Sequence, residues 1–175
     1  MLSPQEKQAL IELLKKIDPN QPYGTELFNA LAKVSPSVAM EAVCLRLNNQ
    51  TQQAEVYLTK RALNDTAYPG QWHCPGSVMR PGEQLKDVFD RLSKQEFDAN
   101  ILVNQFVTNI NNPHEARGHF FSVVYLCSLN EKANKLKGSW FSIDQLPENT
   151  VKIHRQEIIP AAIKVFTATN PINFK

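Results

Sequence analysis

The stretch HCPGSVMRPGE, residues 73–83, places two Pro-Gly steps, an arginine and a glutamate within eleven residues. It is followed by QLKDVFDRLSKQEFDA, residues 84–99, whose apolar residues recur at helical spacing. Pro-Gly pairs mark turns. The stretch is therefore either a tight turn or the entrance to a site that handles phosphate and metal. The polar face of the helix that follows decides between these two interpretations.

The composition of the chain is that of one soluble globular domain. Its 175 residues suffice for a single core, and 42% hydrophobic and 21% charged residues are ordinary values. A net charge of +2 with no Lys/Arg block does not indicate nucleic acid or a membrane as partner. We expect a cytoplasmic protein, because no apolar stretch has the length of a signal peptide core or of a membrane span.

The N-terminal residues predict two short helices. Ser3, Pro4 and Glu6 form a capping-box pattern ahead of an amphipathic run, and a second run ends before Pro36. We interpret residues 1–36 as a helical extension packed on a main domain of residues 37–175, since so short a segment buries too little surface to fold alone. The extension is also a candidate dimer element.

The main domain mixes strands with helices. Strand-like runs cover residues 37–48, 54–63, 101–111 and 117–130, and a shorter one lies within 138–149. Helical runs cover 84–99 and 151–169, the second of which Pro160 should kink or split. This order predicts a layered α/β or α+β domain.

The loop and helix together resemble the Nudix box of hydrolases that act on nucleoside diphosphate derivatives. The resemblance rests on Pro75-Gly76-Ser77, Pro81-Gly82-Glu83, Leu85, Arg91 and Glu96. Trp72 and residues 139–154 resemble flanking elements of the family, so the similarity extends from about Val38 onward. It implies an α/β fold: a Nudix-type α/β/α sandwich with a mixed β-sheet, plus the N-terminal helical extension.

The box is degenerate at four positions. Glu83, Arg91 and Glu96 match the family pattern. The departures are Ser77 for the first glycine, Leu92 for the glutamate after the arginine, Gln95 for the first member of the glutamate pair, and Asp98 for the closing glycine.

The lost carboxylates matter for metal binding. Positions 92, 95 and 96 would share one face of an α-helix, where three carboxylates can hold Mg²⁺ against a substrate phosphate. Leu92 offers no ligand atom and Gln95 only a neutral oxygen. The resemblance makes Glu96, Glu83 and Glu115 the remaining candidate metal ligands. Glu83 has a structural alternative, in which it accepts hydrogen bonds at the helix start and ties the loop to the helix through Arg91.

Candidate substrate-binding residues lie outside the acidic positions. Arg80 and Arg117 can grip a phosphate in bidentate fashion, with Glu115 beside Arg117 in the same loop. Trp72 could stack on a base or sugar, or lie buried in the core.

Two functions remain open from the sequence. The chemistry favours a protein that binds a small nucleoside diphosphate-like ligand with weak or absent hydrolase activity. The alternative is an active hydrolase of nucleoside diphosphate-linked substrates, dependent on Mg²⁺ or Mn²⁺, in which Glu96 acts with Glu83 and Glu115 and Arg91 supports the catalytic helix. Neither function requires nucleic acid, a membrane or another cofactor.

Overall fold

The computed structural model describes residues 1–97, 99–130 and 137–169. Its centre is a seven-stranded sheet with the order β3-β2-β1-β6-β5, in which β4 pairs with β1 and β7 with β2. The strands are β1 Ser37–Leu47, β2 Ala54–Lys60, β3 Trp72–His73, β4 Gly76–Val78, β5 Asn100–Glu115, β6 Gly118–Asn130 and β7 Ser139–Ser142. The sheet is mixed, because β1 and β6 run parallel while the other pairs are antiparallel.

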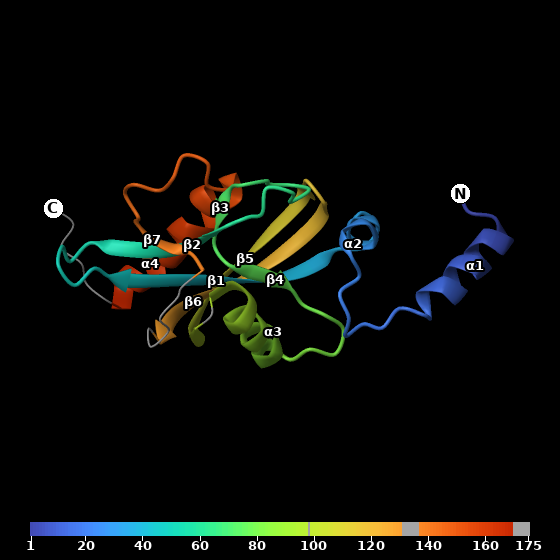
Figure 1. Ribbon diagram of the computed structural model, residues 1–175, viewed down its shortest axis with the longest axis horizontal. Coiled ribbons are helices and arrows are strands. Elements are labelled where there is room, and N and C mark those ends of the chain that lie inside the picture. The colour runs from blue at the N-terminus through green and yellow to red at the C-terminus, as the bar shows by residue number, and fades with distance from the viewer. Residues whose placement is uncertain (98, 131–136, 170–175) are drawn as a thin grey trace.

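Strand β1 shows how the sequence builds the two layers. Its side chains alternate between the faces of the sheet. Val43 and Leu45 join one apolar cluster, and Met40, Ala42 and Cys44 join another. The first cluster is covered by helix α4, Ile159–Thr169, and the second by helix α3, Leu85–Leu92. Figure 1 shows α3 and α4 on opposite sides of the sheet, which confirms the expected α/β/α sandwich.

Two helices depart from simple α-helical geometry. The expected helix over residues 84–99 is α-helical only to Leu92, and Ser93–Phe97 form a π-helical turn, η1. The last helix contains a second π-helical turn, η2, at His154–Ile158, directly before the residue that precedes Pro160. Proline has no N–H to donate to the preceding turn. The irregularity therefore falls at the point where Pro160 interrupts the α-helical hydrogen bonds.

The two N-terminal helices differ in their packing. Helix α2, Thr25–Ala32, buries Ala32 and places the ring of Phe28 6.4 Å from that of Phe120 in β6. Helix α1, Pro4–Leu14, has the expected capping box at Ser3 but buries no residue. Its leucine and isoleucine side chains, Leu10, Ile11, Leu13 and Leu14, are 42–61% exposed. Figure 1 shows α1 extending away from the sheet, so only α2 packs on the domain body; the boundary at residue 36 stays a prediction.

Cys44, Cys74 and Cys127 are free and buried. Of the helices in the described ranges, none has the length and hydropathy needed to cross a membrane.

Candidate functional site

A cavity of about 630 Å³ lies between the box loop, the N-terminal extension and the connections at one end of the sheet. Part of its wall comes from residues 21–29, including the start of α2, and part from the segment 61–68 after β2. The turn between β5 and β6 supplies Glu115 and Arg117. Segments far apart in the sequence thus meet around one cavity.

Four buried polar side chains form the floor of this cavity: Glu41, His73, Ser122 and His154. We call them the cavity floor. The Oγ of Ser122 donates a hydrogen bond to Oε1 of Glu41 at 3.3 Å. Burial raises the pKa of Glu41 to about 7, although Ser122 and the charges of Arg61 and Arg117 oppose this rise. Glu41 is the one charged residue in the buried stretch 39–45 of β1.

The two histidines of the floor are neutral. Burial lowers the pKa of His73 to about 3 and lowers that of His154 well below its ordinary value. The Nδ1 atom of His154 accepts a hydrogen bond from the backbone N–H of Cys74 at 3.2 Å, so its proton is on Nε2. Neither histidine was among the site residues predicted from the sequence, because isolated histidines carry no spacing signal.

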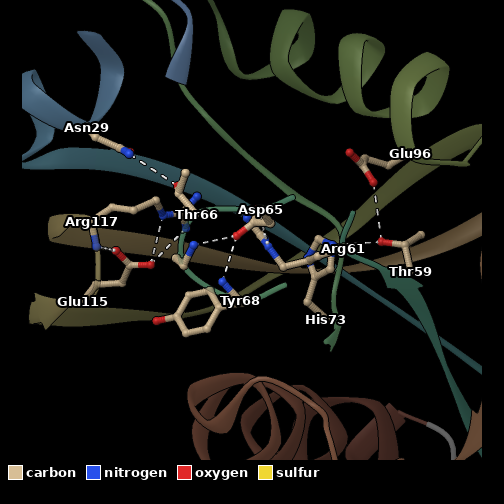
Figure 2. Close-up of polar contacts among 11 residues, drawn as sticks. Asn29, Thr59, Arg61, Asp65, Thr66, Tyr68, His73, Glu96, Glu115 and Arg117 are labelled. Carbon is tan, nitrogen blue, oxygen red and sulfur yellow. Dashed lines mark hydrogen bonds and ion pairs between the residues drawn. The ribbon is translucent and has the colours of Figure 1, made fainter. Parts of the chain in front are cut away.

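A hydrogen-bonded chain leads from the floor to the box helix. Thr59 donates its hydroxyl proton to Oε2 of Glu96 at 3.4 Å, and its Oγ1 lies 3.2 Å from Nε2 of His73 (Figure 2). A threonine hydroxyl has one proton, so Nε2 of His73 is the donor in the second contact. Glu96, which is half-buried, is thereby connected to a residue of the floor, although it is not itself among the lining residues.

Two arginines at the cavity wall are paired with carboxylates (Figure 2). Nε of Arg61 donates to Asp65 at 3.0 Å. Nε and Nη2 of Arg117 donate to Oε1 of Glu115 at 3.1 and 3.0 Å, and its backbone N–H donates to Oε2 at 2.6 Å. Both guanidinium groups lie within 6 Å of the Tyr68 ring, at 5.8 and 5.9 Å. Arg61 and Asp65 were not predicted from the sequence as site residues.

The box loop is held by Glu83 and Arg91. Glu83 accepts hydrogen bonds from Nε and Nη2 of Arg91 at 2.9 and 2.8 Å, and from the backbone N–H of Arg80 at 2.7 Å. Arg91 also donates to Oγ of Ser77 and to the carbonyl oxygen of Val78. The bonds from Arg91 are the main cause that lowers the pKa of Glu83. These contacts are those of the structural alternative, in which the pair ties loop to helix.

The box helix does not present positions 92, 95 and 96 on one face. Leu92 is 1% exposed and packs in the cluster beneath α3, whereas Gln95 is exposed. The π-helical turn begins directly after Leu92 and changes the rotation of the residues that follow it. The expectation of a shared face assumed a continuous α-helix and is corrected here. Asp98 lies outside the described residues.

The predicted metal ligands have separate partners: Glu83 with Arg91, Glu115 with Arg117, and Glu96 with Thr59. Across the described ranges, no three His, Cys, Asp or Glu side chains form a group that could hold a metal ion. The metal-binding role of Glu96, Glu83 and Glu115 therefore stays a prediction.

The structure places three of the four predicted substrate contacts at the cavity. Arg80, Glu115 and Arg117 line the cavity. Trp72 does not: its ring packs edge-on against Phe141 with centroids 4.8 Å apart, as a core residue would. Arg91 also lines the cavity, but the contacts with Glu83, Ser77 and Val78 occupy its guanidinium group.

The mixed sheet between two helical layers, with a Pro-Gly loop leading into one helix, is the architecture that the sequence implied. The model of the NUDIX domain family matches residues 39–162. The chain belongs to this family, which confirms the resemblance found in the sequence. A search of curated protein sequences gave no significant match.

Solved structures share the fold at low sequence identity. NrtR of Shewanella oneidensis is 20% identical with a TM-score of 0.58, over 75% of this chain and 63% of that one. A mutT/nudix family protein of Listeria innocua is 16% identical with a TM-score of 0.62, over 77% of this chain and 97% of that one. The NUDIX domain of Shewanella oneidensis NrtR, crystallised with ADP ribose, is 20% identical with a TM-score of 0.56, over 89% and 97%.

Proposed function

We propose that the protein binds a nucleoside diphosphate-like ligand in the cavity and hydrolyses it weakly or not at all. The observation that supports this proposal is that the cavity offers groups able to bind a ligand, whereas the candidate metal ligands already bind other protein groups. The cavity is large and lined by arginine, aromatic and buried polar side chains. The three candidate metal ligands are each engaged by a different protein group.

The cavity has the chemistry of a nucleotide site. Its volume of about 630 Å³ lies in the range of small-molecule pockets. Phe28, Tyr68 and Phe120 offer apolar ring surface, and Arg80 lies at the box loop. A nucleotide combines a ring with a diphosphate, so both kinds of group have a partner. The NrtR domain crystallised with ADP ribose has the same fold, and ADP-ribose is therefore the first probe.

Weak hydrolysis follows from the metal chemistry. Nudix hydrolases use divalent metals such as Mg²⁺ or Mn²⁺, and a bound metal would polarise the pyrophosphate and activate water. Of the residues present, Glu96 with Glu83 and Glu115 would have to hold it. Glu83 would first have to release Arg91, and Glu115 would have to release Arg117. Each release would break charge-assisted hydrogen bonds between the glutamate and its arginine.

The alternative is an active Mg²⁺- or Mn²⁺-dependent hydrolase, and one contact favours it. Glu96 keeps the second position of the glutamate pair and connects through Thr59 to His73 on the cavity floor. In this alternative Glu96 holds the metal beside the ligand, and Arg91 keeps the loop in place.

Product release from ADP-ribose and a panel of nucleoside diphosphate derivatives, with Mg²⁺ or Mn²⁺, separates the two functions. Binding of ADP-ribose is measured in parallel by calorimetry. We expect binding with little or no turnover in the wild-type protein. Turnover that disappears in Glu96→Gln but persists in the exposed control Glu148→Gln would establish the hydrolase instead. Absence of both binding and turnover in the folded protein would contradict the proposal.

Other expectations stay predictions. A crystal of Shewanella oneidensis NrtR contains a 27mer DNA, so the expected lack of a nucleic-acid partner in the present chain needs its own test. A gel-shift titration with duplex DNA at low salt would provide it. The cytoplasmic location and the dimer are likewise untested.

A further inference from the structure

We infer that the cavity floor, centred on Glu41, recognises the uncharged nucleoside part of the ligand through its hydrogen-bond donors, while the phosphates lie near Arg80. This inference rests on the proposed function and assigns an orientation to the ligand. It gives a role in ligand specificity to Glu41, a residue of β1 that lies outside the box.

The burial of Glu41 is the first argument. The residue is 8% exposed, and the hydrogen bond from Ser122 reaches only Oε1. Within the described part of the chain, Oε2 accepts no hydrogen bond, and it is not among the buried side-chain atoms left without a partner, so it keeps some access to solvent. Because Glu41 lines the cavity, a ligand there would shield Oε2 from water. A ligand that donates to Oε2 avoids the cost of burying this oxygen without a partner.

The position of Gly76 is the second argument. A Cβ atom at this residue would lie 2.2 Å from Oε2 of Glu41 and 3.1 Å from the carbonyl oxygen of Met40. Only glycine leaves the carboxyl group room beside the box loop. The geometry of the loop and the placement of Glu41 therefore depend on each other.

The hydrogen-bonding groups of the floor favour a neutral ligand group. Oε2 of Glu41 is an uncommitted acceptor. Nε2–H of His154 is an uncommitted donor among the described residues, since Nδ1 accepts from Cys74. The hydroxyls of a ribose and the edge of a base together offer both donors and acceptors, so a nucleoside can supply a partner for each of these atoms. A phosphate there would meet a carboxyl group, and the described arginines that act on Glu41, Arg61 and Arg117, already pair with Asp65 and Glu115.

Arg80 provides the opposite environment at the cavity wall. Its Nη1 donates to the carbonyl oxygen of Asn20 at 2.9 Å, and over the described residues its guanidinium group forms no ion pair with a carboxylate. It lines the same cavity on the box loop. An arginine with unused donors is a suitable partner for a diphosphate.

The ionisation of Glu41 gives a readout that structural damage would not imitate. Its pKa of about 7 means that a ligand which donates to the carboxylate binds more tightly as the pH rises from 6 to 8, by about tenfold. The charged and titratable groups that interact electrostatically with Glu41 are Arg61, Arg117, Glu115 and Cys74, and His73 and His154 line the same cavity. Burial keeps both histidines neutral and the Cys74 thiol protonated across this range.

The experiment is calorimetric titration with ADP-ribose, ADP and inorganic pyrophosphate at pH 6, 7 and 8. It compares the wild type with Glu41→Gln and Arg80→Ala, and with the exposed controls Glu148→Gln and Arg155→Ala. We expect Glu41→Gln to weaken ADP-ribose about tenfold at pH 8, to remove its pH dependence and to leave pyrophosphate at pH 8 within about twofold. ADP-ribose carries the pH test because its diphosphate is esterified at both ends, whereas the terminal phosphate of ADP itself titrates at about pH 6. Arg80→Ala should weaken ADP and pyrophosphate alike, by about tenfold.

Two analogues then show which group of the ligand donates the hydrogen bond to Glu41. If Glu41 recognises a ribose hydroxyl, 2′-deoxy-ADP binds weakly to the wild type, and the Glu41→Gln variant binds this analogue with the same weak affinity. If Glu41 instead recognises the amino group of the base, inosine diphosphate binds wild type and variant with the same weak affinity. The melting temperature of each variant verifies folding, and the wild-type pH profile needs no variant.

The outcomes separate the two proposals. ADP-ribose affinity that is independent of pH and of Glu41, or an equal loss for pyrophosphate in Glu41→Gln, would overturn the orientation while nucleotide binding stands. The orientation would also be overturned if Glu41→Gln weakened both analogues as much as it weakens ADP. No binding of any probe by the wild type would refute the proposed function, and the orientation with it.

Discussion

Glu83 and Arg91 show why a box without its full set of carboxylates keeps these two charged residues. Both side chains are mostly buried, 16% and 14% exposed, and their contacts join the loop to the helix. Because these bonds lower the pKa of Glu83, their stabilising effect is complete above its ordinary pKa of 4.5 and is lost as the pH falls through the lowered value. Retention of the pair therefore needs no catalytic explanation.

Leu92→Glu should destabilise the fold and create no metal site. The side chain is 1% exposed within the cluster beneath α3, so the new carboxylate would be buried without a partner. We expect a loss of about 3 kcal/mol or more in urea unfolding. The exposed change Gln95→Glu serves as control, with an effect within about 0.5 kcal/mol. Unchanged stability together with tighter Mg²⁺ binding would place position 92 at a metal site.

Glu41→Gln should stabilise the folded protein at alkaline pH. Burial raises the pKa of Glu41 from 4.5 to about 7, so the folded state disfavours the ionised carboxylate and loses stability as the pH rises from 4.5 through 7. The amide removes this cost, worth at most about 3 kcal/mol. We expect a higher melting temperature than wild type at pH 8 and little difference at pH 4.5. A variant that is less stable at pH 8 would show that the carboxylate supports the fold.

At the scale of elements, helix α2 packs on β6 through a close backbone contact. A Cβ atom at Gly118 would lie 2.0 Å from the carbonyl oxygen of Ala32, and the φ of Gly118 is +150°. The contact is with backbone, which cannot move aside as a flexible side chain can. Glycine at this position is therefore what allows α2 to form a wall of the cavity.

Gly118→Ala should loosen α2 from the sheet. We expect a loss of about 2 kcal/mol in unfolding free energy and faster trypsin cleavage at Lys33. Gly82→Ala is the matched control, because Gly82 also has a positive φ, +83°, but nothing lies within 4 Å of its added Cβ. Gly82→Ala therefore measures the effect of backbone strain alone, and the additional loss in Gly118→Ala measures the effect of the steric contact. Equal effects of the two changes would mean that the contact with Ala32 is unimportant.

At the scale of the whole molecule, the extension divides into a helix that belongs to the cavity and one that does not. Residues 21–25, Phe28 and Asn29 line the cavity, and the amide nitrogen of Asn29 donates to Thr66 at 3.3 Å (Figure 2). Helix α1 lies apart and exposes its apolar side chains. The two helices therefore have different consequences for stability.

Removal of residues 1–16 should leave the domain intact. No residue of α1 is buried, so we expect the melting temperature to change by less than about 2 °C and ADP-ribose affinity to be unaltered. Sedimentation of the full and shortened chains at several concentrations tests the expected dimer at the same time. A melting temperature that falls with dilution only in the full chain would assign α1 to an interface between copies.

The sequence by itself determined the features that depend on neighbouring residues. Apolar periodicity indicated the main strands and helices, Ser3 and Glu6 the cap of α1, and Pro160 the irregular last helix. The box loop, with Glu83 and Arg91 eight residues apart, fixed the family. Such patterns are local because propensities and turns act over a few residues. The mixed sheet followed from the family resemblance.

Only the tertiary structure decided the site. Glu41, His73, Ser122 and His154 come from four segments, and their meeting depends on the pairing of β1 with β6 and on the packing of the last helix. A lone glutamate in a buried strand was the one local signal that could have indicated Glu41. The burial of Leu92, the turn of η1 and the separate partners of the three glutamates also depend on long-range packing. Desolvation and pairing are set by that packing, so the ionisation of the site is a property of the fold.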